Sequence, residues 1–403
     1  MHRSKFTNYF MFGALYFTQG TILAYFLSIN ALYFIENGLS GMDLGIFGTI
    51  AMIPFVIKIF YGMLSDRVSL FGMGHRKPYI LIGLLIQIAS LIAVPLIDLS
   101  SQFWLFVGVA FLLQMGMALY DTCTDGLALD TVPKNEEGTI QAIMVGGRAL
   151  GLVITAPLVG LLAEFASWPW VFWTLALTTL IPIPFVLGIR EGKRPIEQEF
   201  QWDAFKAFRN KYIIAIAVVG FLFFLVYAGV NAVVNLSLEV RFPGAFNKAV
   251  AGLVSAVLGI GIIGGGIFGG RVLDSLGKKK AIWAALLTSL AANIALSLIP
   301  GANWAWIVVF ILGLSFGVQQ TIIFALSMNA TDTRIAASMY SILMAVTNVA
   351  QGVGMFITGA LSDLMSFRVL FIIMGAINIL AIPLIGIIAK GRTNPQDQSM
   401  KAS

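Results

Sequence analysis

Four ionisable side chains lie within long apolar stretches of the sequence, where a charge needs a partner or a purpose. They are Lys58, Asp121, Asp125 and Arg148. On membrane-insertion scales, each such charge costs roughly 2.5–3.5 kcal/mol at the centre of a helix. A buried carboxylate whose proton affinity follows its surroundings can load and unload a proton, and a cation can hold an anionic group. These residues therefore indicate proton coupling or recognition of a charged ligand.

The depths of these four residues predict two ion pairs. Asp121 lies about 12 Å from the inner end of its helix. Arg148 lies about 13 Å from the inner end of the next helix, so the two depths match. An Asp121–Arg148 pair is the simplest way to compensate both charges. Asp125 lies one turn from Asp121, and Lys58, about 9 Å deep, is expected to pair with it. The alternative, that both pairs only rigidify the helices, stays open.

Uncharged polar side chains are the second group of residues that could bind a ligand. Amides donate and accept hydrogen bonds without carrying charge, which suits hydroxyl or amide groups on a ligand, and a tyrosine hydroxyl acts similarly. Hydrogen bonding between helices is the alternative role. The candidate binding residues are Gln19, Tyr25, Asn231, Asn235, Gln320, Asn348 and Gln351, with Asn30 and Gln319 beside them.

Composition shows which elements position these residues. The 403-residue chain is 59% hydrophobic and only 11% charged, so one water-soluble core cannot bury its apolar surface. A membrane span needs about 20 apolar residues. The sequence predicts an all-α membrane protein with twelve transmembrane helices, at residues 8–34, 42–64, 79–97, 103–128, 139–164, 168–189, 212–238, 248–272, 280–299, 304–328, 336–362 and 367–389.

The distribution of basic residues predicts the orientation. Near the outer helix ends lie only Arg241, Lys248 and Arg368, and apart from Lys58 and Arg148 the other Lys and Arg fall in the termini and the inner loops. The positive-inside rule then places both termini in the cytoplasm. The expected location of the protein is the inner or plasma membrane. The net charge of +6 reports this topology, so no nucleic-acid partner is needed to explain it.

A loop motif occurs twice and indicates an internal duplication. The first copy runs from Gly62 through Asp66 and Arg67 to Gly74-His75-Arg76-Lys77-Pro78, and the second from Gly270 through Asp274 to Gly277-Lys278-Lys279-Lys280. A polar linker at 190–211 separates a six-helix half at 1–189 from a six-helix half at 212–403, which ends in a short cytoplasmic tail. The register between the halves sets Asp121 opposite Gln320 and Arg148 opposite Thr347.

The paired loops resemble the signature loop of the major facilitator superfamily. That resemblance implies two pseudo-symmetric six-helix bundles that rock about a central cavity to give alternating access. In the family, the loop aspartate is thought to latch the inward-closed state. Here the resemblance assigns that gating role to Asp66, Arg67, Arg76, Lys77, Asp130 and Asp274. The alternative is that these charges only stop the helices from sliding into lipid.

A narrower resemblance involves residues 72–80 and the Asp121-Thr122-Cys123-Thr124-Asp125 element. Both are similar to the branch of muropeptide permeases and the acetyl-CoA transporter, but His75 and Tyr120 depart from its pattern. Sugar–cation symporters and pterin–folate carriers share a similar loop. The Ala156-Pro157 element partly resembles the superfamily's antiporter motif, and its usual glycine is replaced by Ala156.

Other sequence features predict packing and exclude enzymatic chemistry. Gly261, Gly265 and Gly269 form consecutive Gly-x-x-x-Gly steps, which let another helix approach closely. The histidines are His2 and His75, both outside the spans, so we expect no metal site. We also expect no cofactor and no catalytic residues, since no nucleophile lies beside a base.

The function expected from these features is secondary active transport, by a monomer in the lipid bilayer. A proton-coupled symporter of a polar organic solute fits best, and Arg148 favours an anionic one. Proton-coupled drug or metabolite antiport is the first alternative. A non-transporting membrane scaffold or assembly factor on the same fold is the second.

Overall fold

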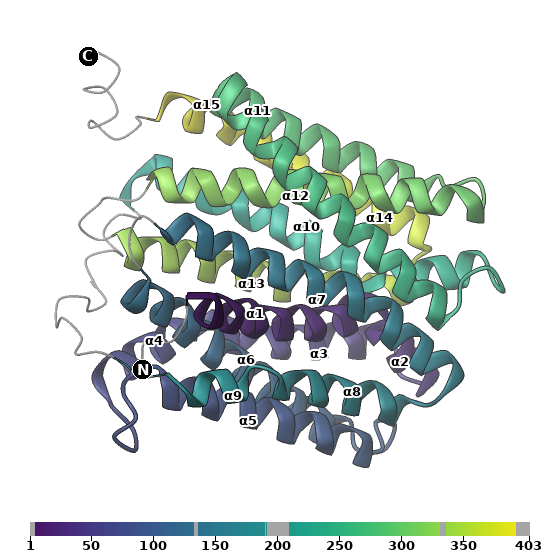
Figure 1. The fold of residues 1–403 in the computed structure, drawn as a ribbon. Coiled ribbons are helices and arrows are strands. Elements are labelled where there is room, and N and C mark those ends of the chain that lie inside the picture. The colour runs from purple at the N-terminus through teal and green to yellow at the C-terminus, as the bar shows by residue number, and fades with distance from the viewer. Residues whose placement is uncertain (1–4, 133–135, 190, 192–208, 331–335, 392–403) are drawn as a thin grey trace. The chain divides into compact units, whose positions relative to one another are not determined.

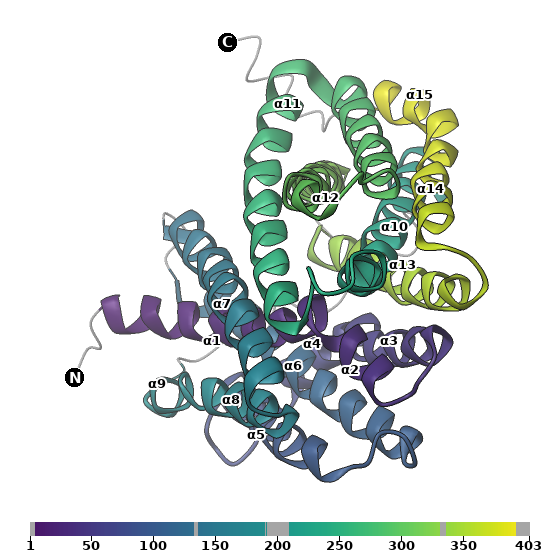
Figure 2. The same cartoon turned by 90° about the vertical axis from the view of Figure 1, so that its right-hand side faces the viewer.

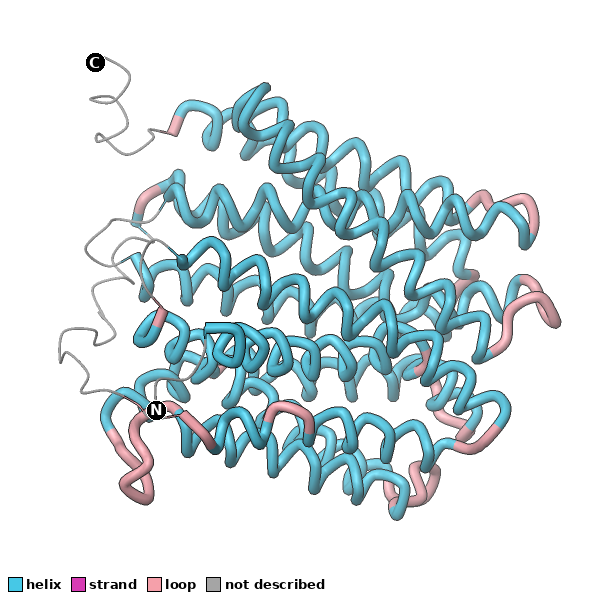
Figure 3. Tube along the Cα trace, viewed as in Figure 1, coloured by secondary structure: helices cyan, strands magenta, loops and turns pink. Residues whose placement is uncertain are grey.

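The computed structural model describes residues 5–132, 136–189, 191, 209–330 and 336–391. Figure 3 shows helices joined by short loops, with no strand in this part of the chain. The first half comprises α1 Lys5–Ser28, α2 Asn30–Glu36, α3 Gly41–Val56, α4 Lys58–Arg67, α5 Lys77–Ala93, the 3-10 turn η1 Val94–Leu96, α6 Phe103–Thr131, α7 Glu137–Phe165, α8 Trp168–Leu180 and α9 Ile183–Leu187 (Figure 1).

The second half continues the same pattern. It comprises α10 Lys211–Arg241, α11 Lys248–Ser297, α12 Ala302–Ala330, α13 Ala336–Leu364, α14 Phe367–Ile377, the 3-10 turn η4 Asn378–Ala381 and α15 Ile382–Lys390. Eleven stretches among the described residues are long and apolar enough to cross a membrane. One of them, α11, is 50 residues long and turns at Gly277, whose φ is 77°. It supplies two spans, so the predicted twelve-helix membrane fold is confirmed.

Packing divides the chain into two compact units. The first contains Met1–Glu199 with Glu239–Ala256, and the second contains Phe200–Leu238 with Val257–Ser403. The predicted boundaries at 189 and 212 remain predictions, and within the predicted linker, residues 190 and 192–208 lie outside the described part, as does the tail at 392–403. Large apolar side chains such as Trp104, Leu177 and Trp304 are exposed along the spans, as hydrocarbon contact requires.

Glycine contacts set the spacing of helices within each unit. In the first unit α1 packs against α7, and the two helices cross in the view of Figure 2. A Cβ at Gly151 would overlap the Phe17 carbonyl oxygen. In the second unit a Cβ at Gly261 or Gly265 would overlap the backbone of α12. The predicted close approach at the Gly-x-x-x-Gly steps is therefore confirmed.

The second span is broken where it carries a charge. Pro54 lies inside α3, α3 ends at Val56, and α4 begins at Lys58. Proline has no backbone N–H and its ring crowds the preceding turn, so it bends or breaks a helix. The break puts Lys58 at the first position of a new helix within the span.

Candidate transport site and gating loop

Asp121 is the centre of a polar cluster in the first unit. It lies in α6 and is 9% exposed. Its Oδ1 accepts a hydrogen bond from Gln19 Nε2 of α1 at 2.7 Å, and its Oδ2 lies 3.5 Å from Lys58 Nζ of α4. The structure therefore brings three of the candidate residues together from three helices.

Asp125 has a different partner from the one expected. One turn beyond Asp121, its Oδ1 accepts a hydrogen bond from the Tyr16 hydroxyl of α1. The expected Lys58–Asp125 pair was wrong, because Lys58 pairs with Asp121. Depth along a helix places Lys58 only to about one turn, and the two carboxylates are one turn apart. Tyr16 was missed by the sequence reasoning, which named Gln19 and Tyr25 on this helix.

Arg148 does not make the expected pair with Asp121. Its side chain is exposed, and within the described part of the chain it forms no hydrogen bond or ion pair with Asp121, whose partners are Lys58 and Gln19. Asp121 is already engaged by Lys58 and Gln19. Arg148 nevertheless lies within electrostatic range of Asp125.

This arrangement separates two chemical tasks. The Asp121 carboxylate is compensated by a cation, whereas Asp125 is hydrogen-bonded by a neutral phenol. A guanidinium such as that of Arg148 can hold a carboxylate or phosphate through two parallel hydrogen bonds. The first unit therefore contains one carboxylate that is paired with a cation and one that is bonded by a hydroxyl group.

Tyr25 lies apart from this cluster. It is buried and packs on Phe172, with ring centroids 5.1 Å apart. It lines a small cavity whose other walls are apolar side chains of the first unit, among them Ile22 and Phe106. The structure does not bring Tyr25 to Asp121.

The second unit carries the amides, several of them buried. Asn231 and Gln319 are 4% and 2% exposed, and their side-chain amide atoms have no hydrogen-bond partner among the described residues. Their helices meet at Tyr227 of α10 and Phe316 of α12, with ring centroids 4.7 Å apart. Asn235 is also buried, Gln320 is half-buried, and Gln351 Nε2 donates to Asn348 Oδ1 at 3.1 Å.

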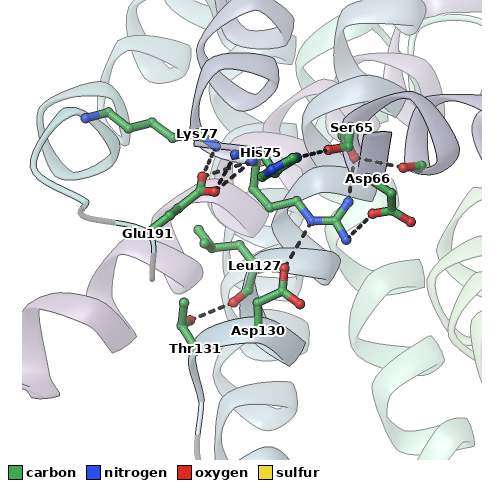
Figure 4. A network of polar contacts seen from close by, with 10 residues as sticks. Ser65, Asp66, His75, Lys77, Leu127, Asp130, Thr131 and Glu191 are labelled. Carbon is green, nitrogen blue, oxygen red and sulfur yellow. Dashed lines mark hydrogen bonds and ion pairs between the residues drawn. The ribbon is translucent and has the colours of Figure 1, made fainter. Parts of the chain in front are cut away.

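The loop between α4 and α5 closes around Arg76. Its guanidinium lies 2.6 Å from Asp66 Oδ1 and 3.3 Å from Asp130 Oδ2, and it donates to the Ser65 hydroxyl at 2.5 Å. Figure 4 shows these partners converging from α4 and α6. We call these four residues the Arg76 network. Arg76 is 5% exposed, so the acids compensate its charge almost entirely out of contact with solvent.

Lys77 and Arg67 are placed differently from Arg76. Lys77 Nζ donates to the carbonyl oxygens of Leu187 and Ile189, at 2.6 and 3.3 Å, and Arg67 is exposed at the end of α4. Glu191 was missed by the sequence reasoning. Its carboxylate accepts the backbone N–H groups of residues 75, 76 and 77 (Figure 4). The available signal was an acid directly after the sixth span.

The second copy of the loop lacks an equivalent network within the described residues. Asp274 is exposed, and its side chain forms no ion pair or hydrogen bond with those residues. Lys278 instead donates to the Tyr212 hydroxyl at 2.8 Å and lies 5.1 Å from the centre of its ring. The duplicated motif therefore forms different contacts in its two positions.

Comparison with curated proteins identifies relatives that are transporters. The sialic acid transporter NanX of Escherichia coli is 26% identical over 290 residues, covering 70% of this chain and 68% of the relative. A folate-biopterin transporter of Synechocystis is 25% identical over 426 residues, covering 96% and 83%. The putative transporter AmpG 4 of Rickettsia felis is 22% identical over 277 residues, covering 63% and 65%, and supports the narrower resemblance.

Solved structures show the same fold at low sequence identity. The nucleoside transporter NupG matches with a TM-score of 0.77 at 13% identity, covering 96% of this chain and 99% of that one. A bacterial homologue of the human lysosomal transporter Spinster matches with a TM-score of 0.73 at 16% identity, covering 97% and 98%. The sequence model of the Major Facilitator Superfamily matches residues 6–346. The chain is thus a secondary transporter, not an enzyme, and it belongs to the Major Facilitator Superfamily.

Proposed function

We propose that this chain is a proton-coupled symporter of a polar, anionic organic solute. The charge layout of the first unit carries the proposal: Lys58 compensates Asp121, Asp125 is held by the Tyr16 hydroxyl, and Arg148 is exposed. An anion bound at Arg148 and a proton bound at Asp125 would together leave the charge of this region unchanged. Loading both therefore avoids the cost of an added charge within a span.

The proposed solute also carries hydroxyl or amide groups. The buried amides of Asn231 and Gln319 support this assignment, since an unsatisfied amide in hydrocarbon surroundings costs several kcal/mol, of the order of 2–7. The named solutes of the relatives, sialic acid and folate-biopterin, are polar organic molecules of this kind. They are the first compounds to test.

We further propose that the Arg76 network is the inner gate of a protein with both termini in the cytoplasm. The buried Arg76 forms ion pairs with Asp66 and Asp130 at the helix ends. Breaking such pairs is costly when a partner is lost, so the network favours one state until other contacts replace it. The proposed location is the inner or plasma membrane.

The decisive experiment is uptake into liposomes containing the purified protein. With an inside-alkaline gradient, we expect accumulation of radiolabelled sialic acid or folate that a protonophore abolishes. Expulsion under the same gradient would instead indicate antiport, the alternative suggested by Ala156-Pro157. No flux and no thermal stabilisation by any tested solute would favour a scaffold.

The roles of the two charged residues are separable in the same assay. Asp125→Asn should abolish gradient-driven accumulation while solute exchange continues, since the amide mimics a protonated carboxyl. Arg148→Gln should raise the KM for the anionic solute at least tenfold. Asp43→Asn, which alters a capping residue of α3, is the control. Unchanged accumulation in Asp125→Asn would remove that residue from coupling.

A further inference from the structure

We propose that Glu191 is a positioning residue for the inner gate. Its carboxylate binds the start of α5 and thereby holds Arg76 between Asp66 and Asp130. The inference deepens the proposed function, since it rests on the gating role of the Arg76 network. It concerns a residue that does not touch the solute.

The contacts of the Glu191 carboxylate are unusually complete. It accepts the N–H of His75 at 2.6 Å, the N–H of Arg76 at 2.9 and 3.1 Å, and the N–H of Lys77. Figure 4 shows the carboxylate facing these groups. The first N–H groups of a helix have no partner within it, and negative charge is favourable at this end. One carboxylate therefore satisfies three consecutive donors at the start of α5.

The same junction is bonded in the opposite direction. Lys77 Nζ donates to the carbonyl oxygens of Leu187 and Ile189, at 2.6 and 3.3 Å. Leu187 is the last residue of α9, and a cation is favourable at the carboxyl end of a helix. Lys77 of α5 thus bonds the end of α9, and Glu191, which follows α9, bonds the start of α5.

Two glycines make room for these contacts. Gly74 has a φ of +105°, and a Cβ there would lie 2.5 Å from Glu191 Oε2. A Cβ at Gly126 of α6 would lie 2.5 Å from the Arg76 guanidinium carbon. A side chain at Gly74 would displace the carboxylate, and one at Gly126 would displace the guanidinium.

Arg76 is consequently held at both ends. Its backbone N–H is bonded to Glu191, and its guanidinium is bonded to the acids of α4 and α6. Without the carboxylate, the N–H groups of residues 75–77 lose their partner and the start of α5 can fray. The guanidinium then loses the fixed backbone from which it reaches Asp66 and Asp130.

Hydrogen exchange of the full chain in nanodiscs tests the docking. In Glu191→Gln, we expect the amides of residues 75–77 to exchange at least tenfold faster than in the wild type. Asp43→Asn is a matched control, because Asp43 also bonds the start of a helix, accepting the Ser40 N–H at 2.9 Å. It should accelerate exchange only near residue 40. Unchanged exchange at 75–77 in Glu191→Gln would overturn the proposal.

The single cysteine of the sequence tests the effect on Arg76. Cys123 is fully buried in α6, one turn before Gly126 and on the same side of the helix. We expect N-ethylmaleimide to label it at least threefold faster in Glu191→Gln and in Arg76→Gln, and no faster in the double variant. Glu191→Asp should restore part of the protection.

The possible results separate clearly. The proposal would be overturned if Cys123 of Glu191→Gln were labelled at the wild-type rate. It would also be overturned if the labelling rate of the double variant were raised by the product of the two single effects. Either result would show that Glu191 caps α5 without positioning Arg76. Because no solute is added, failure of the transport assay does not affect this test. Its own failure would leave the proposed transport function standing.

Discussion

At the scale of single residues, the first unit distributes four charges unequally. Lys58 and Asp121 form the ion pair, and Gln19 occupies the second oxygen of that carboxylate. Asp125 is bonded by a phenol and Arg148 is exposed. We propose that the pair is a fixed element of the helix packing and that Asp125 and Arg148 respond to a proton and a solute.

The Lys58–Asp121 pair predicts a pattern of stability. Asp121→Asn leaves the Lys58 ammonium without its carboxylate. Because the two side chains keep 27% and 13% exposure, we expect a loss of about 2 kcal/mol, less than for a fully buried pair. The double variant Lys58→Met/Asp121→Asn should recover most of it in thermal unfolding. A double variant as unstable as the sum of both changes would contradict a direct pairing.

At the scale of elements, the helices are placed by breaks and by glycines. The break after α3 starts α4 at Lys58, which sets where the ammonium enters the bundle. Glycine contacts between α1 and α7 bring the helix of Gln19 and Tyr16 close to that of Arg148. Small residues thereby determine which polar side chains meet.

The α1–α7 contact predicts a difference between two glycines of the same helix. Gly151→Ala adds a Cβ that overlaps the Phe17 carbonyl oxygen and should destabilise the protein by about 1–3 kcal/mol. Gly146 has nothing within 4 Å of such an atom, so Gly146→Ala should be neutral or stabilising by up to about 1 kcal/mol. Equal melting temperatures for the two variants would refute this account of the contact.

At the scale of the whole molecule, the duplicated fold carries unequal loops. The first copy builds the Arg76 network, whereas Asp274 of the second is exposed. The halves also differ in their interior polar groups, with carboxylates in α6 and amides in α10 and α12. The same architecture therefore presents different polar side chains in its two repeats.

The unequal loops predict unequal effects of the same substitution. Asp66→Asn removes the 2.6 Å partner of Arg76 and should slow uptake at least tenfold in the liposome assay. Asp274→Asn should reduce uptake less, because its carboxylate is exposed. A larger loss from Asp274→Asn would mean that the second loop carries the gate.

Fusion reporters check the proposed topology. Alkaline phosphatase inserted after Gly244, in the loop between α10 and α11, should be active because we place that loop outside. The same enzyme inserted after Met73 should be inactive, and a fluorescent protein at the C-terminus should fluoresce. The reverse pattern would invert the proposed orientation.

The sequence by itself determined the fold of this protein. Uninterrupted apolar stretches of about 20 residues indicate helices in a bilayer, since a helix satisfies its backbone hydrogen bonds within one segment, and the repeated loop identified the family. The sequence also located the charges of Lys58, Asp121, Asp125 and Arg148, because ionisable residues are rare within apolar stretches. Their depth followed from counting residues along a helix.

Only the tertiary structure decided which of these charges meet. Partner choice depends on helix rotation and on breaks such as the one at Ile57, which shift a side chain by less than the turn that separates Asp121 from Asp125. Lys58 therefore pairs with Asp121, and Tyr16 bonds Asp125. Glu191 was hidden for a related reason: its partners are backbone N–H groups far away in the chain, and backbone groups leave no signature in a sequence.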